Sequence, residues 1–292
     1  MKKKLLTSAF AAVLCMGAGL ATVYVTPATA AQSSKSDKPE ALYPNATRKE
    51  PKLDLTSPRD QKAINDGLEA ANAGDDEKAE KDLQPIIDKS KSKYAKAMAL
   101  QGLAGVKYKN GDIKGAITML QQAIDLGVMP NDTYFQLLYM LAQFQMADQD
   151  YQASLNTLAK WRDEGKKETA DSYALEGNAD YRLKKYPEAI AAIQKAKSLG
   201  TKSEPSWDQI LMASYAESGQ TDQAAKLAMQ AVADAPNDAT ALNNAVAILT
   251  EAKQYPQAID LMEKARANGT LKTQTHYVNL AKLYLITGQS SD

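Results

Sequence analysis

The chain repeats itself at a nearly constant interval over most of its length, and this limits its possible folds more than any other feature. In six successive stretches a small residue is followed, four positions later, by a residue that is usually larger and apolar. The small residues are 37, 38, 35, 35 and 34 positions apart. A fixed period of this size is typical of folds that stack one supersecondary element many times. The six pairs are Ala79/Leu83, Ala116/Leu120, Ser154/Leu158, Ala189/Ile193, Ala224/Ala228 and Ala258/Met262.

Each pair lies on an amphipathic stretch that follows a turn. Gly74-Asp75, Gly111-Asp112 and Tyr186-Pro187 are three of these turns, and another amphipathic stretch precedes each of them. A spacing of four residues places both members of a pair on one face of a helix. The sequence therefore predicts an all-α chain of helix–turn–helix repeats, in which small residues let paired helices approach closely.

This pattern resembles the tetratricopeptide repeat (TPR), a helix–turn–helix element of about 34 residues. The family places a large residue, Leu, Gly or Ala, and Tyr on its first helix, and parts of this motif occur at Leu103-Ala104, at Leu211 with Tyr215, and at Leu280-Ala281 with Tyr284. The resemblance implies a TPR solenoid, a right-handed superhelix, over residues 57–292. It would contain six full repeats and one terminal helix.

Two different segments precede the repeats. A basic start, Lys2-Lys3-Lys4, is followed by an apolar run and then by small residues up to Ala30, which predicts a cleaved secretory signal over residues 1–30. An uncleaved membrane anchor facing the periplasm is the alternative, because the run is nearly long enough to span a bilayer. Residues 31–56 are rich in Lys, Ser, Pro and Asp, which predicts a disordered polar linker. Ser57-Pro58 predicts the N-cap and first position of the first helix.

Charge and residue counts argue against several classes of function. The 35 Lys and Arg residues balance the 35 Asp and Glu residues, so the chain has no basic field that would attract nucleic acid. The single Cys lies in the predicted signal, and the single His is His276. A Cys-rich or His-pair metal site is therefore impossible, and a triad would have no spare base. We expect no catalytic residue, no cofactor and no metal, and we expect His276 at the surface.

Binding is the function that the resemblance favours. In TPR proteins the first helices line a concave groove that takes an extended peptide or a partner helix. Amides there can pair with a peptide backbone, Tyr offers rigid area with a polar tip, and Met adapts its shape. Lys residues, with which some relatives clamp acidic C-terminal tails, are absent from the corresponding positions. Counting along each repeat places on this face Tyr108, Tyr139, Gln143, Met146, Asn178, Tyr181, Gln209 and Asn243.

Glycine positions predict where several second helices end. Gly127, Gly165, Gly200 and Gly269 each stand 11 residues after the small residue that opens a pair. Glycine readily takes the left-handed conformation that closes a helix. We therefore predict a left-handed helix end at each of these four sites.

Trp161 interrupts a column of mostly small residues. Its ring either fills space as a wedge that alters the curvature or is exposed to a partner.

The last predicted helix is unusual because residues 277–286 are apolar except at Asn279 and Lys282, whereas a terminal helix should have a polar outer face. Either the natural chain continues, or a second copy or another protein docks there. The predicted docking face comprises Tyr277, Leu280, Leu283 and Tyr284.

Taken together, the sequence predicts a non-catalytic scaffold in the periplasm of a Gram-negative bacterium, with a protein or peptide partner. Its plan of signal, charged lead and repeats is similar to that of periplasmic TPR proteins assigned to TonB-type energy-transduction systems. Two alternatives stay open. One is an envelope assembly factor for outer-membrane or peptidoglycan machinery, and the other is an enzyme with a carboxylate pair hidden in the groove.

Overall fold

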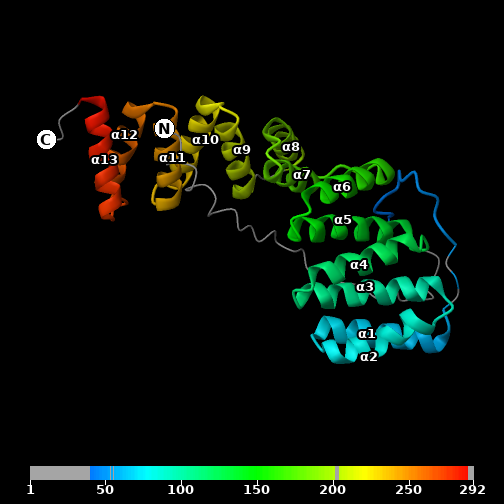
Figure 1. Ribbon diagram of the computed structural model, residues 1–292. Coiled ribbons are helices and arrows are strands. Elements are labelled where there is room, and N and C mark those ends of the chain that lie inside the picture. Colours follow the sequence, from blue (N-terminus) through cyan, green and yellow to red (C-terminus); the bar gives the residue numbers. More distant parts are fainter. Residues whose placement is uncertain (1–39, 53, 55, 201–203, 289–292) are drawn as a thin grey trace, which may run out of the picture. The chain divides into compact units, whose positions relative to one another are not determined.

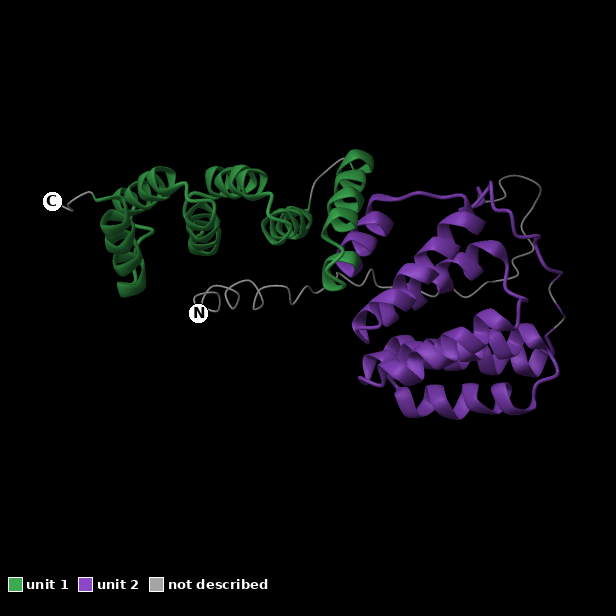
Figure 2. Cartoon of the chain, turned by 45° about the horizontal axis from the view of Figure 1, so that its top comes forward, with its two compact units in different colours: residues 1–16, 180–292 green, residues 17–179 purple. Residues whose placement is uncertain are grey.

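The computed structural model describes residues 40–52, 54, 56–200 and 204–288, so the predicted signal lies outside the described residues. In this part of the chain all regular secondary structure is helical and forms thirteen helices, α1 to α13 (Figure 1). The chain divides into two compact units (Figure 2). Unit 2 has the described residues up to 179, and unit 1 has those from 180 onward.

Unit 2 is built from helices that pack against their neighbours in the chain. The pairs α1–α2, α3–α4 and α5–α6 form hairpins, and each hairpin packs on the next through α2 with α3 and α4 with α5. The unit boundary falls within α7. The helices are α1 (Pro58–Ala73), α2 (Asp76–Lys89), α3 (Lys93–Lys109), α4 (Ile113–Asp125), α5 (Asn131–Ala147), α6 (Tyr151–Gly165) and α7 (Ala170–Arg182).

Unit 1 continues the same hairpin pattern. Its helix α9 packs with α8 and α10, and the series continues through α11 and α12 to α13. The predicted all-α fold of TPR type, with a single helix after the last hairpin, is confirmed in the described residues. The handedness of a superhelix stays a prediction. The helices are α8 (Tyr186–Leu199), α9 (Pro205–Glu217), α10 (Thr221–Asp234), α11 (Ala239–Glu251), α12 (Tyr255–Ala267) and α13 (Gln274–Thr287).

The small residues that define the repeat lie where the prediction places them, between packed helices. All six have no exposed surface. Close approach is also visible at Gly67 on α1, where an added Cβ would lie 2.6 Å from Leu83 Cγ on α2. Side chains larger than these would hold the helices apart, so the periodic small residues set the interhelical distance. The six are Ala79, Ala116, Ser154, Ala189, Ala224 and Ala258.

The turns within the hairpins share one backbone feature, a residue with positive φ. Glycine fills this position in three hairpins and a residue with a side chain in the other three. The six positive-φ residues are Gly74, Gly111, Gln149, Lys184, Gly219 and Lys253.

The predicted start of the first helix is confirmed, because the Ser57 hydroxyl accepts a hydrogen bond from the Asp60 N–H at 3.1 Å.

The glycine prediction for helix ends is half correct. Gly127 and Gly269 have φ values of 68° and 80° and follow the ends of α4 and α12. Gly165 is instead the last residue of α6, and Lys166 takes the left-handed conformation with φ 47°. Gly200 follows α8 with an extended φ of −82°. The predicted left-handed conformation is therefore wrong at Gly165 and Gly200.

These two glycines serve close packing of aromatic rings. A Cβ on Gly165 would lie 3.2 Å from Tyr43 and 3.3 Å from Phe135. A Cβ on Gly200 would lie 3.2 Å from the ring of Trp207. Contacts this tight favour the residue without a side chain, so the missing Cβ matters here more than the backbone conformation.

The predicted disordered linker is wrong for residues 40–52, whereas residues 31–39 lie outside the described residues. Tyr43 is only 8% exposed and belongs to the hydrophobic core of unit 2. It packs against Phe135 of α5 and Trp161 of α6. The segment is polar in composition, but one buried aromatic side chain and several hydrogen bonds hold it in place.

Candidate functional site

The eight predicted groove residues divide between the two units. Five belong to unit 2 and three to unit 1, so the structure describes two separate candidate faces. Unit 2 contains Tyr108, Tyr139, Gln143, Met146 and Asn178, and unit 1 contains Tyr181, Gln209 and Asn243.

In unit 2, helix α5 presents three of these residues on one face. Tyr139, Gln143 and Met146 are four and three positions apart, which aligns them along the helix, and all three are half-buried. Tyr108 on α3 is also half-buried and stacks on Phe144 of α5, with ring centroids 4.0 Å apart and planes inclined by 5°. The first helices therefore offer a surface of aromatic, amide and thioether groups.

Tyr139 connects this face with α6 and α7. Its ring centroid lies 5.4 Å from that of Trp161. Burial raises the pKa of the Tyr139 hydroxyl well above its usual value, and the nearby Asp171 and Tyr43 raise it further. The hydroxyl is protonated at neutral pH, as an ordinary tyrosine is, and can donate a hydrogen bond.

Two buried amide oxygens add to the face. Gln101 Oε1 on α3 and Asn178 Oδ1 on α7 are buried and have no hydrogen-bond partner among the described residues. A buried polar atom without a partner costs about 1–3 kcal/mol. The sequence reasoning missed Gln101, although it stands seven residues before Tyr108 and thus on the same face of α3.

The candidate face of unit 1 is less enclosed. Tyr181 packs against Tyr186 with ring centroids 5.9 Å apart. Burial raises the pKa of the Tyr181 hydroxyl, and the charge of Glu217 raises it further. Gln209 is half-buried on α9, whereas Asn243 is exposed on α11. Unit 1 therefore brings together fewer of the predicted residues than unit 2.

A second candidate site lies at the ends of the unit 2 helices, where residues 40–52 and Asp54 form what we call the strap. Its anchor is Tyr43, whose ring lies 4.7 Å from that of Phe135 and 5.9 Å from that of Trp161, edge to face. The indole N–H of Trp161 donates to the Tyr43 hydroxyl at 3.2 Å. Trp161 is only 3% exposed, so of the two predicted roles the ring open to a partner is wrong and the ring fills space inside unit 2. It contacts two rings of the same chain, those of Tyr43 and Tyr139.

Arg48 of the strap binds the loop between α4 and α5. Its guanidinium donates to the carbonyl oxygens of Met129 and Gly127 at 3.0 and 2.8 Å and to Asn131 Oδ1 at 2.6 Å. It also lies over the ring of Tyr134, 4.2 Å from the centroid. Both carbonyls follow the C-terminus of α4, so Arg48 fixes the loop between α4 and α5 from a distant part of the chain.

Two acidic strap residues bind helix N-termini. The Asn131 N–H at the start of α5 donates to both carboxylate oxygens of Glu50 at 3.2 Å, while the N-cap residue of α5, Pro130, offers no side-chain cap. The N–H groups of Lys93 and Tyr94 at the start of α3 donate to Asp54 at 2.7 and 3.0 Å. The carboxylates of the strap thus pair with helix N-termini, and its guanidinium pairs with carbonyl oxygens of the loop between α4 and α5.

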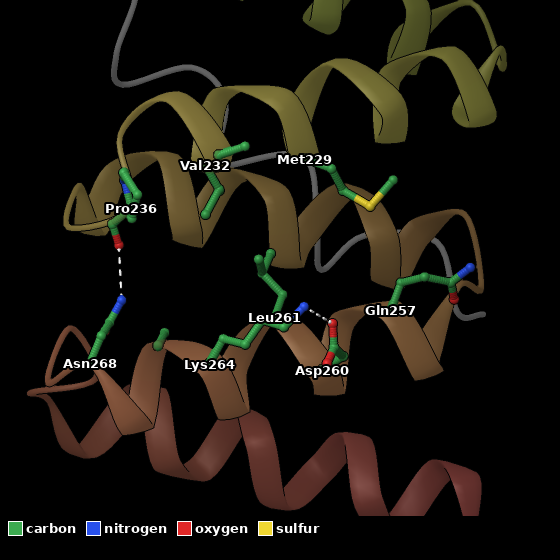
Figure 3. Close-up of a pocket in the computed structure, with 10 residues that line it drawn as sticks. Met229, Val232, Pro236, Gln257, Asp260, Leu261, Lys264 and Asn268 are labelled. Atoms are coloured by element: carbon green, nitrogen blue, oxygen red, sulfur yellow. Dashed lines mark hydrogen bonds and ion pairs between the residues drawn. The ribbon is translucent and has the colours of Figure 1, made fainter.

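A pocket of about 340 Å³ lies between the second helices of two hairpins in unit 1 (Figure 3). Val232 and Leu261 form part of its apolar lining, and the Lys264–Asp260 ion pair of 2.8 Å lies at its edge. The Asn268 side chain donates to the Pro236 carbonyl at 3.3 Å and joins the two sides. The sequence reasoning considered only first helices, so it missed this pocket. The remaining lining residues are Met229, Ala233, Gln257 and Ala265.

The predicted docking face on α13 needs correction. Leu280 and Leu283 are buried in the core of unit 1, and Tyr284 is half-buried with its hydroxyl donating to Glu263 at 2.9 Å. These side chains contact the rest of unit 1 because they share the face of α13 that packs on α12. Of the predicted four, Tyr277 is the one that is exposed. The apolar residues exposed on α13 are Tyr277, Val278, Ala281, Leu285 and Ile286. Docking through α13 stays a prediction.

His276 is also buried, which contradicts its expected position at the surface. It is 5% exposed, and its Nδ1 accepts a hydrogen bond from the Lys272 N–H at 3.3 Å. The Thr273 hydroxyl caps α13 by accepting from the His276 N–H at 3.3 Å. His276 therefore helps to fix the loop before α13.

The described part of the chain contains neither a membrane-spanning helix nor a metal-binding cluster. None of its helices combines the length and the apolar character needed to cross a bilayer. These residues also contain no group of three or more His, Cys, Asp or Glu side chains positioned to hold a metal ion.

Comparison with known proteins identifies the repeat. Residues 214–270 match the sequence model of the tetratricopeptide repeat family. No curated protein matches the chain significantly by sequence. A solved TPR protein from Parabacteroides merdae ATCC 43184 is similar in structure over 80% of this chain and 88% of its own, with a TM-score of 0.57 and 16% identity.

Two further solved structures share the fold. YrrB, described as a TPR protein with an unusual peptide-binding site, matches 68% of this chain and 97% of its own, with a TM-score of 0.52 and 16% identity. MamA from Desulfovibrio magneticus RS-1 matches 60% of this chain and 94% of its own, with a TM-score of 0.52 and 19% identity. The chain therefore has the fold of tetratricopeptide repeat proteins, and its residues 214–270 match the sequence of the repeat. Proteins of this class are generally non-catalytic scaffolds that bind a protein or a peptide.

Proposed function

We propose that this chain is a non-catalytic scaffold that binds an extended peptide or a partner helix along the first-helix face of unit 2. The observation that carries the proposal is the face of α5 on which Tyr139, Gln143 and Met146 lie in line, all three half-buried and therefore partly accessible to a ligand. The side-chain amide of Gln143 can pair with the N–H and C=O groups of a peptide backbone. The half-buried Tyr108, Gln143 and Met146 supply adjoining contact area.

Other TPR structures support peptide binding as a use of this fold. YrrB shares the fold and has an unusual peptide-binding site. The enzyme alternative has weaker support, since it requires a carboxylate pair in the groove and the residues that gather on this face of unit 2 are mainly aromatic, amide and thioether groups. No cofactor is needed for binding of this kind.

The proposed location is the periplasm of a Gram-negative bacterium. The basic start, the apolar run and the small residues before Ala31 support export. Association with a TonB-type energy-transduction complex is the favoured assignment, because the order of signal, charged lead and repeats is similar to that of such components. An envelope assembly factor for outer-membrane or peptidoglycan machinery is the second candidate.

Self-association through α13 is a further proposal. It is supported by the side chain of Leu285, which is 80% exposed.

Site-specific photocrosslinking in living cells tests the binding face. A photoreactive amino acid at Gln143 or Met146 should crosslink to a partner, because both side chains are half-buried on α5. The matched control is Gln122, an exposed residue of the second helix α4. Equal crosslinking from all three positions, or crosslinking from Gln122 alone, would contradict the proposal. Mass spectrometry of the adducts separates a TonB-type partner from an assembly substrate.

A further inference from the structure

The contacts of the strap are of the kind that a folded domain makes with a bound peptide. Residues 40–52 contain no helix or strand, and the groups they contact stand 79 to 125 positions further along the chain. An aromatic ring enters the core, a guanidinium pairs with carbonyl oxygens, and a carboxylate pairs with an N–H group. The backbone takes part as well, since the Leu42 N–H donates to Asp132 and the Thr47 N–H donates to the Glu164 carbonyl at 2.8 Å.

We propose that the surface beneath residues 40–52 is a peptide-binding site, distinct from the first-helix face, which the chain fills with its own strap. In trans it would bind an extended peptide of the same chemistry. Such a peptide carries an aromatic residue in the place of Tyr43, an arginine five positions later and a carboxylate two positions after that. Phe135 and Trp161 recognise the ring, the carbonyls of Gly127 and Met129 recognise the arginine, and the N-terminus of α5 recognises the carboxylate.

The strap can be exchanged because few of its side chains are buried. Tyr43 is buried, Arg48 is half-buried, and Leu42, Asn45 and Lys49 between and beside them are exposed. A strap of this kind can detach without disrupting the helix hairpins. Its tether to α1 gives it an effective concentration of about millimolar order, so a free peptide can compete only when the anchors of the strap are weakened.

A variant of the full chain with weakened anchors tests the proposal. Tyr43→Ala combined with Arg48→Ala removes the ring and the guanidinium from the strap. The matched control is Leu42→Ala combined with Lys49→Ala, which truncates two neighbouring exposed side chains. The probe is a fluorescein-labelled synthetic peptide with the sequence of residues 40–52, and its binding is followed by fluorescence anisotropy.

The weakened variant should bind the peptide at least tenfold more tightly than the control does. A peptide with Tyr43→Ala should lose at least tenfold in affinity for the weakened variant. Equal affinity of the weakened variant and the control would overturn the proposal and make the strap a fixed part of the fold. If circular dichroism shows that the double variant has lost its helices, Arg48→Ala alone against Lys49→Ala gives the same comparison. Gln122→Ala, at an exposed position of α4, should leave peptide binding unchanged. Crosslinking from Gln143 and Met146 tests the first-helix proposal by a separate measurement, so its failure is distinguishable from failure of this one.

Discussion

The second helices of the hairpins begin differently in the two units. In unit 2 the helices α2, α4 and α6 each start at an aspartate whose carboxylate accepts a hydrogen bond from a backbone N–H of the first turn. In unit 1 the N-cap side chains of α8, α10 and α12 do not cap the first turn. The aspartates are Asp75, Asp112 and Asp150, and the corresponding residues of unit 1 are Lys185, Gln220 and Gln254.

The first helices do not divide in this way. In unit 2, the strap residues Glu50 and Asp54 bind the N-termini of α5 and α3. In the described part of unit 1, α9 has no side-chain cap, whereas Asp238 caps α11 and Thr273 caps α13. Helix termini with satisfied N–H groups resist fraying. The same repeat pattern therefore gives second helices that are capped in unit 2 and uncapped in unit 1.

The largest expected effect concerns the aromatic anchor of the strap. Trp161→Ala should destabilise unit 2 by about 3–5 kcal/mol, because it removes a buried ring and the support of Tyr43. Native-state hydrogen exchange measures the loss of protection helix by helix. Trp207→Ala, which removes the buried tryptophan of unit 1, is the matched comparison. If either variant lowered hydrogen-exchange protection equally in both units, the two units would unfold together. The comparison of unit 1 with unit 2 as separately stabilised parts would then be wrong.

A smaller gain is expected when unit 1 receives the cap of unit 2. Gln220→Asp turns Gly219-Gln220 into the Gly-Asp sequence that precedes α4 and should stabilise unit 1 by about 1 kcal/mol. Urea unfolding followed by circular dichroism measures the change. Gln220→Glu is the control, since it adds the same charge on a side chain that is a poor N-cap. An equal gain from Glu would show that charge, and not capping geometry, distinguishes the units.

The smallest effect concerns the left-handed turn residues. Lys253 has φ 58°, which costs a residue with a side chain about 1–2 kcal/mol, and glycine avoids most of this cost but loses more entropy on folding. Lys253→Gly should therefore stabilise unit 1 by about 0.5 kcal/mol in thermal unfolding. Lys226→Gly, in the middle of α10, should instead destabilise it by about 1 kcal/mol. A loss of stability with Lys253→Gly would mean that the turn does not require the left-handed conformation.

The helix hairpins could be predicted because each depends on residues close together in the chain. Ala79 and Leu83 contribute to the packing of α2 on α1 within one repeat, and Asp112 caps the helix that it precedes. The candidate site was predicted less completely. Repeat counting found Tyr108 and Gln143 but not Gln101, since the importance of a buried amide depends on which donors surround it.

By itself, the sequence determined the repeat, the all-α fold and the face on which the first helices place their tyrosines and amides. Period and local spacing are enough for this, because helical geometry converts spacing along the chain into position on a face. Only the tertiary structure decided that Tyr43 is buried, that Trp161 meets it and that His276 lies inside unit 1. Composition describes the average polarity of a segment. It does not show that one aromatic ring, Tyr43, is buried, because the residue that helps to form its site, Trp161, stands 118 positions further along the chain.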